Sequence, residues 1–329
     1  MTFMVTSGHD GTRGSVATWH VAENGTPLLS SNRSHDARAL HLATAGDQVY
    51  ACLVDDTVVA WDVDPSGSLG RPRAATLPGL PCHSAVVGRH LFVSLYQAGE
   101  IAVLDRWTLR EARRIRLPGA ERGASRPHQA LPAPDGTTAL VVDAGTDSIL
   151  ALDTANDLEP VAVTHVDTGT APRNGVFADE TRVFVTGEAS SSIIEFRYLP
   201  EQRTLEPQRT RASSWRAGAR PAAITAGLAA VYQTNRATGT IRGLPLHDPD
   251  ACWDLPVGAG AMSASVARVN GQEFLWAAAK DRGIVTVHPL SDGAPTPPAL
   301  ARLAIPGASA VAALDHEPRS GTEVLEHAV

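Results

Sequence analysis

Two hairpins in the sequence place charged residues where a buried strand meets its turn. Residues 183–196 read VFVTGEASSSIIEF, and Glu188 stands where the first hydrophobic strand ends. Residues 231–244 read VYQTNRATGTIRGL, and the corresponding position holds Arg236. A carboxylate and a guanidinium brought to one place could move a proton, hold an anion or stabilise an oxyanion. The two stretches look like copies of one unit with opposite charges at one position.

The same hairpin occurs seven times, starting near residues 3, 49, 91, 139, 183, 231 and 275. Successive starts are 46, 42, 48, 44, 48 and 44 residues apart, close to the ~40 to 50 residues of a propeller blade. Each copy alternates apolar residues on both arms and has Gly, Asp, Ser or Asn in its turn. The sequence therefore predicts an all-β, seven-bladed propeller.

A short apolar run precedes each hairpin except the first. A further run at 307–314, GASAVAAL, has no hairpin after it. These two irregularities predict a ring in which the C-terminal strand completes the first blade and removes unpaired sheet edges. We expect a single propeller over residues 1–315 and a polar, loosely held tail over 316–329.

The composition limits the function classes. The chain has 329 residues, 43% of them hydrophobic, and a formal charge of −7 without long charged runs, which favours neither nucleic acid nor membrane as a partner. The N-terminus has no basic and apolar leader pattern, so we expect a cytoplasmic protein, monomeric or weakly homo-oligomeric. Cys52, Cys82 and Cys252 lack metal-ligand spacing and are expected to be reduced structural thiols.

The propeller fold would gather polar residues at one mouth of the channel, where first strands begin and second strands end. The second-strand ends hold Gly8 or His9, Val54, Tyr96, Ala144, Glu188, Arg236 and Lys280. The first-strand starts hold Arg38, His83, His128, Arg173 and Arg220. Scattered surface polarity would not select these positions repeatedly, although propellers also use such pairs to satisfy backbone groups.

The hairpin lengths predict which of these residues face each other. A turn centred near residue 180 pairs Arg173 with Glu188, so the arginine would hold the carboxylate ionised. A turn near 136 brings His128 opposite Asp143 or Ala144, and a carboxylate there would orient the imidazole.

The motifs also carry a resemblance to a known family. HQALPAPDG, APRNGVFADE, TGEASSS and NRATGTI resemble successive blades of the seven-bladed propeller lactonases, which include propeller-type 6-phosphogluconolactonases and the carboxy-cis,cis-muconate lactonising enzyme. The resemblance covers essentially the whole chain. It implies roles in lactone chemistry for four residues: His128, Arg173, Glu188 and Arg236.

The sequence departs from the family pattern at several polar positions. Asn174 stands where the family has histidine, Arg126 replaces the first histidine of an H.H pair, and Ala222 and Ala223 occupy a stretch where a carboxylate is usual. These departures bear on the phosphosugar substrate of the family more than on the fold.

The leading hypothesis is metal-independent and cofactor-independent hydrolysis, or the reverse closure, of a small anionic lactone at the channel mouth. Glu188 or His128 would be the base, and Arg173 and Arg236 would stabilise the oxyanion or hold the substrate anion. Residues expected to shape substrate binding are His83, Tyr96, Asp143, Asn174, Arg220 and Lys280.

Two alternatives stay open. One is a cyclisation or isomerisation in specialised metabolism, which the departures from the family pattern favour. The other is a non-enzymatic binding scaffold, against which the four charged motif residues argue.

Overall fold

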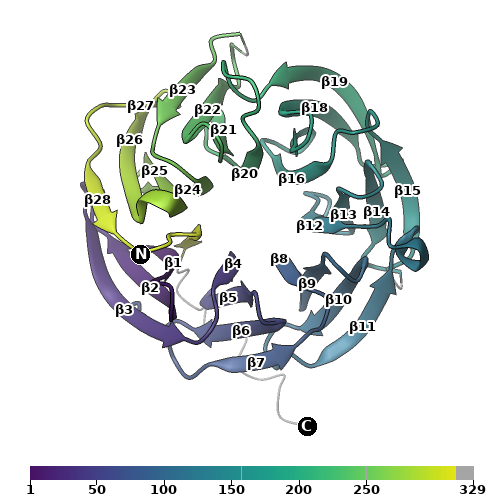
Figure 1. The fold of residues 1–329 in the computed structure, drawn as a ribbon, viewed down its shortest axis with the longest axis horizontal. Helices are drawn as coiled ribbons and strands as arrows, with labels where there is room; N and C mark the ends of the chain where they lie inside the picture. The colour runs from purple at the N-terminus through teal and green to yellow at the C-terminus, as the bar shows by residue number, and fades with distance from the viewer. Residues whose placement is uncertain (157, 249, 316–329) are drawn as a thin grey trace.

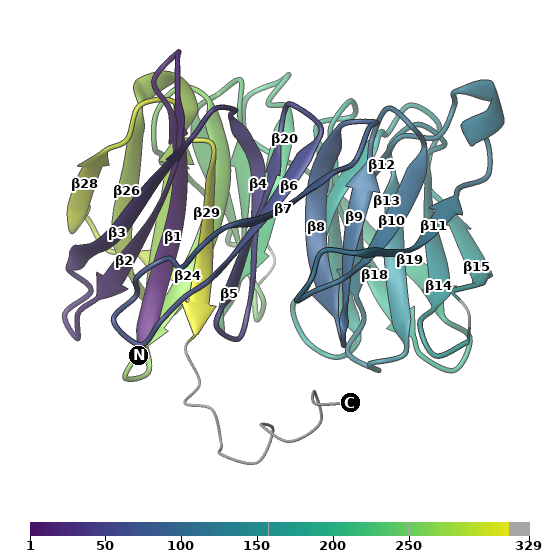
Figure 2. The ribbon, with the colours of Figure 1, turned by 90° about the horizontal axis from the view of Figure 1, so that it is seen from below.

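The strands of the chain form seven antiparallel sheets arranged around a common axis (Figure 1). This computed structural model describes residues 1–156, 158–248 and 250–315. Seen from the side, the strands run through the thickness of a disk (Figure 2). The seven-bladed propeller predicted from the sequence repeats is confirmed, and the predicted tail at 316–329 lies outside the described residues.

The first blade joins the two ends of the described chain. Its innermost strand β29 (Ala310–Asp315) pairs antiparallel with β1 (Thr2–His9), and β2 (Gly14–Val21) and β3 (Pro27–His35) follow outward. Without β29, the inner edge of β1 would lack a hydrogen-bonding partner. The predicted closure of the first blade by a C-terminal strand is therefore what the strand pairing shows.

The other blades run outward in chain order. Blade 2 consists of β4 (Ala39–Ala45), β5 (Gln48–Leu53), β6 (Thr57–Asp62) and β7 (Arg73–Thr76). Blade 3 consists of β8 (Pro81–Val87), β9 (His90–Leu95), β10 (Glu100–Asp105) and β11 (Glu111–Arg116). Blade 4 consists of β12 (Pro127–Pro132), β13 (Thr138–Asp143), β14 (Ser148–Asp153) and β15 (Pro160–His165).

Blade 5 consists of β16 (Pro172–Phe177), β17 (Arg182–Gly187), β18 (Ser192–Leu199) and β19 (Thr204–Ala212). Blade 6 consists of β20 (Pro221–Ala226), β21 (Ala230–Asn235), β22 (Thr240–Pro245) and β23 (Trp253–Pro256). Blade 7 consists of β24 (Ala261–Val269), β25 (Gln272–Ala279), β26 (Ile284–Ser291) and β28 (Ala301–Ala304), and the short β27 (Ala294–Pro295) pairs with the end of β26.

Burial follows the position of a strand in its blade. Every residue of β13 and β21 is buried, because these second strands are covered by neighbouring blades on both faces. The outermost β15 has no buried residue. Phe196 and Tyr198 of blade 5, for example, pack against Leu140 and Val142 of blade 4. The core therefore lies between the blades.

Helical structure is confined to two single turns of 3₁₀ helix in the described ranges, η1 (Ala120–Arg122) and η2 (Lys280–Arg282). Within these ranges, no helix has the length and apolar character needed to cross a membrane.

One backbone hydrogen bond recurs in all seven blades where the second strand ends. The N–H at that position donates to a carbonyl just before the innermost strand of its blade, over 2.7–3.1 Å. The donors are His9, Val54, Tyr96, Ala144, Glu188, Arg236 and Lys280. The alignment made from the hairpin sequences is confirmed, and His9 is the equivalent residue of the first blade.

A β-bulge recurs at the start of the innermost strand in blades 2 to 7. The pairing with the second strand there shifts register between the first strand residue and the second or third residue after it. The bulged residues are Leu40, Cys82, His128, Arg173 with Asn174, Ala222 with Ala223, and Met262. A bulge changes the direction of the side chains that it carries. The equivalent residues of six blades are therefore all displaced from regular strand pairing.

Candidate active site

The bulged residues surround a cavity of about 230 Å³. All eight of them belong to its wall. The other lining residues come from strands beside the bulges and from the closing strand: Leu80, His41, His83, Tyr96, Ser263, Ser309 and Ala310. The repeated bulge is thus the local feature of the chain that builds the site.

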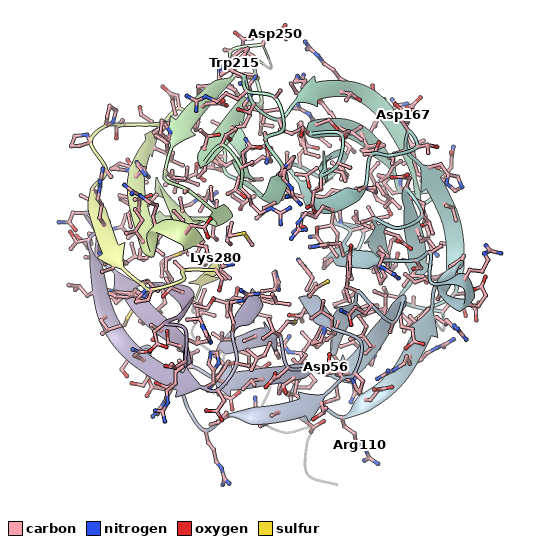
Figure 3. The ribbon with its side chains drawn as sticks, in the orientation of Figure 1. Asp56, Arg110, Asp167, Trp215, Asp250 and Lys280 are labelled. Atoms are coloured by element: carbon pink, nitrogen blue, oxygen red, sulfur yellow. The ribbon has the colours of Figure 1, made fainter. Side chains whose placement is uncertain are left out.

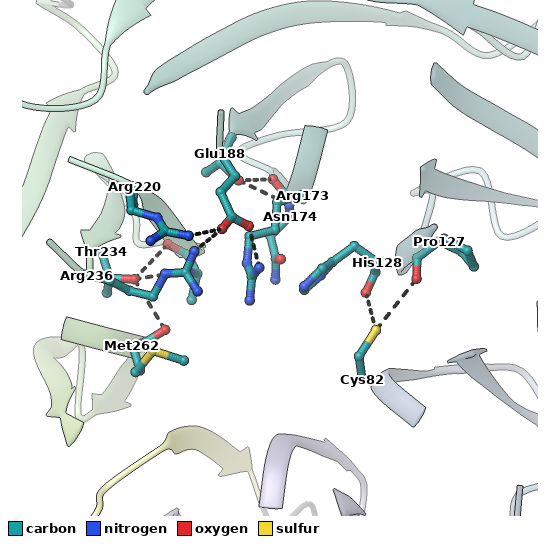
Figure 4. Close-up of polar contacts among 12 residues, drawn as sticks. Cys82, Pro127, His128, Arg173, Asn174, Glu188, Arg220, Thr234, Arg236 and Met262 are labelled. Carbon is teal, nitrogen blue, oxygen red and sulfur yellow. Dashed lines mark hydrogen bonds and ion pairs between the residues drawn. The ribbon is translucent and has the colours of Figure 1, made fainter. Parts of the chain in front are cut away.

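Glu188 lies at the centre of a cluster of arginines beside this cavity (Figure 4). One carboxylate oxygen, Oε2, accepts a hydrogen bond from Arg173 Nη1 at 2.5 Å. The other, Oε1, accepts from Arg236 Nη2 and lies 3.8 Å from Arg220 Nη2. The predicted pairing of Arg173 with Glu188 is present. It does not follow simple hairpin register, because Pro172 faces Gly187 and pairing resumes at Gly175 with Val185.

The cluster is partly shielded from water. The side chains of Arg173, Glu188 and Arg236 are 18%, 23% and 23% exposed, whereas that of Arg220 is 67% exposed. Burial acts to raise the pKa of Glu188, but the charges of Arg173 and Arg236 outweigh it and lower the pKa below its ordinary value. Glu188 is therefore an ionised anchor between two guanidinium groups.

His128 has the properties of a neutral imidazole. Its ring is buried and points toward Arg173 (Figure 4), and its Nδ1 has no hydrogen-bond partner in the described part of the chain. Burial, followed by the charge of Arg173, lowers the pKa of His128 well below 6.5. Tyr96 lies edge-on to the ring at 6.0 Å between centroids. Such an imidazole can accept a proton at neutral pH.

His83 also lines the cavity, but it is engaged with a residue that the sequence analysis missed. The rings of His41 and His83 stack at 3.7 Å between centroids. Burial lowers the pKa of His83 well below 6.5 and that of His41 to about 3. Both rings are therefore uncharged at neutral pH, and two imidazoles can stack without repulsion.

Asp143 does not serve the site as predicted. Its buried carboxylate accepts hydrogen bonds from Ser125 Oγ at 2.6 Å, Arg126 N at 2.7 Å and Gly145 N at 2.9 Å, and it is not part of the cavity wall. The bulge is the reason, because it places Pro127 opposite Asp143 and turns His128 away. The prediction that a carboxylate of this hairpin orients His128 is wrong.

The remaining predicted binding residues divide into two groups. Asn174 lines the cavity, and its buried Oδ1 has no partner among the residues that the structure describes. Arg220 and Lys280 are not part of the wall. Arg220 stays close to Glu188, while Lys280 begins the 3₁₀ turn at the inner side of blade 7 (Figure 3).

Cys82 and Met262 also line the cavity and were not predicted as site residues. The Cys82 thiol donates to the carbonyl of His128 at 3.5 Å, and burial raises its pKa to about 12. It is thus an uncharged thiol that braces the bulge carrying His128. The repeated position just after the start of each first strand was the available sequence signal, since Cys82 and Met262 align there with His128.

Within residues 1–156, 158–248 and 250–315, no group of three or more His, Cys, Asp or Glu side chains is arranged to hold a metal ion. No disulfide is formed by the three cysteines in these ranges. The functional groups of the cavity wall are guanidinium, imidazole, amide, phenol, thiol, thioether and hydroxyl.

The cavity of this seven-bladed ring brings an arginine, an asparagine and a neutral histidine together on one side of its wall. Residues 2–249 match the family described as lactonase, 7-bladed beta-propeller. The chain belongs to this family, as the sequence motifs indicated. None of the curated protein sequences compared with the chain matches it.

Solved structures share the fold at low sequence identity. A protein of Bacteroides fragilis described as a "putative 6-phosphogluconolactonase" is 20% identical with a TM-score of 0.77, covering 95% of this chain and 98% of its own. The periplasmic gluconolactonase of Pseudomonas aeruginosa is 18% identical with a TM-score of 0.77, covering 96% of this chain and 100% of its own. The likeness spans the whole ring in both cases.

Proposed function

We propose that the protein hydrolyses a small anionic lactone in the central cavity, with His128 as the general base and Arg173 as the oxyanion-stabilising group. Membership of the lactonase family supports the reaction class. The observation that carries the proposal is the presence of a neutral, unpartnered imidazole and a cationic guanidinium on adjacent bulges of one cavity wall.

We favour His128 over Glu188 as the base on physical grounds. A general base works best when its pKa permits both a free lone pair and a useful affinity for the proton. The pKa of each group is lowered, but both oxygens of the Glu188 carboxylate are also held by guanidinium groups. His128 Nδ1 carries no such bond in the described residues.

The proposed steps balance within the site. A water attacks the lactone carbonyl carbon while His128 takes its proton. The carbonyl oxygen becomes an oxyanion beside Arg173, whose buried Nε–H has no partner among described residues. The tetrahedral intermediate then breaks the ring C–O bond, and His128 returns the proton to the leaving alkoxide. The product is a hydroxy acid.

Glu188 has a positioning role in this scheme. It joins Arg173 to Arg236 through its two oxygens and thereby fixes where the Arg173 guanidinium lies. Arg236 adds its positive charge from beside the cavity, and its buried Nε–H has no partner within the described ranges. An anionic substituent of the substrate would bind here, since a second anion can share two or three guanidinium groups with Glu188.

The test is a panel of γ- and δ-lactones with and without a carboxylate or phosphate, followed by pH-stat titration of the acid released. We expect turnover of anionic lactones and a loss of about 10³-fold in kcat/KM for His128→Gln. His165→Gln, an exposed histidine on the outer strand of the same blade, is the matched control. Absence of turnover across the panel, or an unaffected His128→Gln variant, would overturn the proposal.

A further inference from the structure

The cavity wall is divided into two contiguous arcs. Blades 3 to 5 contribute His83, Tyr96, His128, Arg173 and Asn174, which form the polar arc, together with Leu80 and Cys82. Blades 6, 7, 1 and 2 contribute Ala222, Ala223, Met262, Ala310 and Leu40, which form the apolar arc. Figure 4 shows Met262 across the opening from His128.

The hydroxyl groups in the apolar arc are already engaged. Ser263 Oγ accepts from Val311 N at 3.2 Å and donates toward Val311 O at 3.4 Å. Ser309 Oγ donates to Ala39 O at 2.8 Å. A ligand hydroxyl placed against the alanine, leucine and methionine side chains of this arc would lose its water without gaining a hydrogen bond, which is unfavourable.

His41 borders the apolar arc and can offer a ligand one hydrogen-bond donor, its Nε2–H. Its Nδ1 accepts from the backbone N–H of Ser84 at 3.2 Å, and its ring face is covered by His83. Away from His41, the apolar arc presents mainly methyl, methylene and thioether surface to a ligand. Burying apolar ligand surface there is favourable by about 25 cal/mol per Å².

We infer that the substrate is a lactone with an anionic group on one side and an apolar, alkyl-type substituent on the other, rather than a polyhydroxylated sugar lactone. This inference rests on the proposed lactone hydrolysis. The anionic side faces Arg173 in the polar arc, and the alkyl side lies on Met262 and its neighbours. A cavity of about 230 Å³, the volume of about seven or eight waters in the liquid, suits a five-membered ring with a short chain.

Binding can be tested separately from turnover with lactams, which have the ring shape of the lactone but resist hydrolysis. The probes are 5-oxopyrrolidine-3-carboxylates that carry a propyl or a hydroxymethyl group at C2. We expect the propyl lactam to bind the wild-type chain at least about tenfold more tightly, measured by calorimetry. The corresponding γ-lactones should show the same preference in kcat/KM.

Two variants of one residue show where the preference arises. Met262→Gln introduces an amide into the apolar arc and should reduce the propyl preference to threefold or less. Met262→Leu keeps the apolar surface and should retain the preference. Thermal unfolding identifies a variant that is merely destabilised.

The outcomes separate the two proposals. Tighter propyl binding without turnover of either lactone supports the apolar arc and contradicts the hydrolysis. Turnover of both lactones with an equal or a hydroxymethyl preference keeps the hydrolysis and overturns the inference. Failure of both lactams to bind, or an unchanged preference in Met262→Gln, also overturns the inference.

Discussion

Blades 5 and 6 have the same backbone conformation at the cavity but side chains that differ in size and charge. Both innermost strands follow a residue with positive φ, Ala171 at 49° and Arg220 at 54°, and both bulge immediately afterwards. A threonine hydroxyl of the second strand accepts from the bulged N–H in each, from Asn174 at 3.1 Å and from Ala223 at 2.9 Å. The backbone conformation of the two blades is therefore the same, including this hydrogen bond.

The side chains on this shared backbone differ in size and charge. Blade 5 carries Arg173 and Asn174 on its bulge, where blade 6 carries Ala222 and Ala223. At the end of the second strand the charges reverse, with Glu188 in blade 5 and Arg236 in blade 6. The repeat thus fixes where the bulged residues lie on the cavity wall, whatever their type. In blade 5 these residues are polar and can contact a substrate, whereas in blade 6 they are alanines, which leave space in the cavity.

Among changes to blades 5 and 6, the largest effect is expected when the bulge of blade 5 is made like that of blade 6. Arg173→Ala removes the guanidinium that faces the developing oxyanion, so kcat/KM should fall by about 10²- to 10³-fold in the lactone assay. Arg197→Ala, an exposed arginine on the second outermost strand of the same blade, is the control and should stay near wild type. A loss below about fivefold in Arg173→Ala would remove this residue from the proposed mechanism.

A smaller effect is expected from breaking the contact that joins the two blades. Glu188→Gln keeps the shape of the side chain but leaves Arg173 and Arg236 without their shared anion, and a misplaced guanidinium can reduce rate by up to about 10²-fold. We expect a 10- to 100-fold loss in kcat/KM with a folded chain, checked by kinetics and circular dichroism. The control is Glu206→Gln, which breaks the exposed ion pair with Arg197 in the same blade. Full activity in Glu188→Gln would contradict the anchoring role.

The pH dependence should reflect the neighbours of His128 in the polar arc. Burial and the charge of Arg173 lower the pKa of His128 well below 6.5, so the imidazole remains neutral, and active as a base, until the pH falls through that lowered value. Glu188 also has a lowered pKa and stays ionised in the same range. We expect kcat/KM at pH 5.5 within about twofold of its value at pH 7, where a base with an ordinary histidine pKa would lose about tenfold. A midpoint of the acid limb near pH 6.5 would disagree with this site.

The smallest effect is expected from Arg220 of blade 6, the most exposed arginine beside Glu188. Its side chain is 67% exposed and its Nη2 lies 3.8 Å from Glu188 Oε1, so solvent weakens the interaction between the two charges. Arg220→Gln should raise KM by no more than about threefold, and the difference should disappear in 0.5 M salt. Arg216→Gln, an exposed arginine of the same loop, provides the comparison. A loss as large as that of Arg173→Ala would place Arg220 in the polar arc.

The repeat made much of this arrangement predictable. Alternation of apolar residues and the turn chemistry identify each hairpin, and hairpin length fixes which residues end the second strands. That is why Tyr96, Glu188 and Arg236 were aligned correctly. The pairing of Arg173 with Glu188 followed from the same reasoning, although the bulge shifts the register beneath it.

The errors have a common cause in the bulges. Simple register placed His128 opposite a carboxylate, but the bulge turns His128 to the cavity and leaves Asp143 to hold its own hairpin. A bulge adds one residue to one strand. In one short strand this hardly alters the alternation of apolar and polar residues, so the sequence does not reveal it. Contacts between blades, such as His41 on His83, were invisible for the same reason.

The sequence by itself determined the seven-bladed ring, its closure by the last strand and the residues at the inner ends of the strands. These properties depend on local alternation, turn residues and repeat length, all of which are written along the chain. Only the tertiary structure decided which of those residues share a cavity, which carboxylate is an anchor, and that one arc of the wall is apolar. These depend on the bulges and on closing the ring, which brings blades distant in sequence to face each other across the cavity.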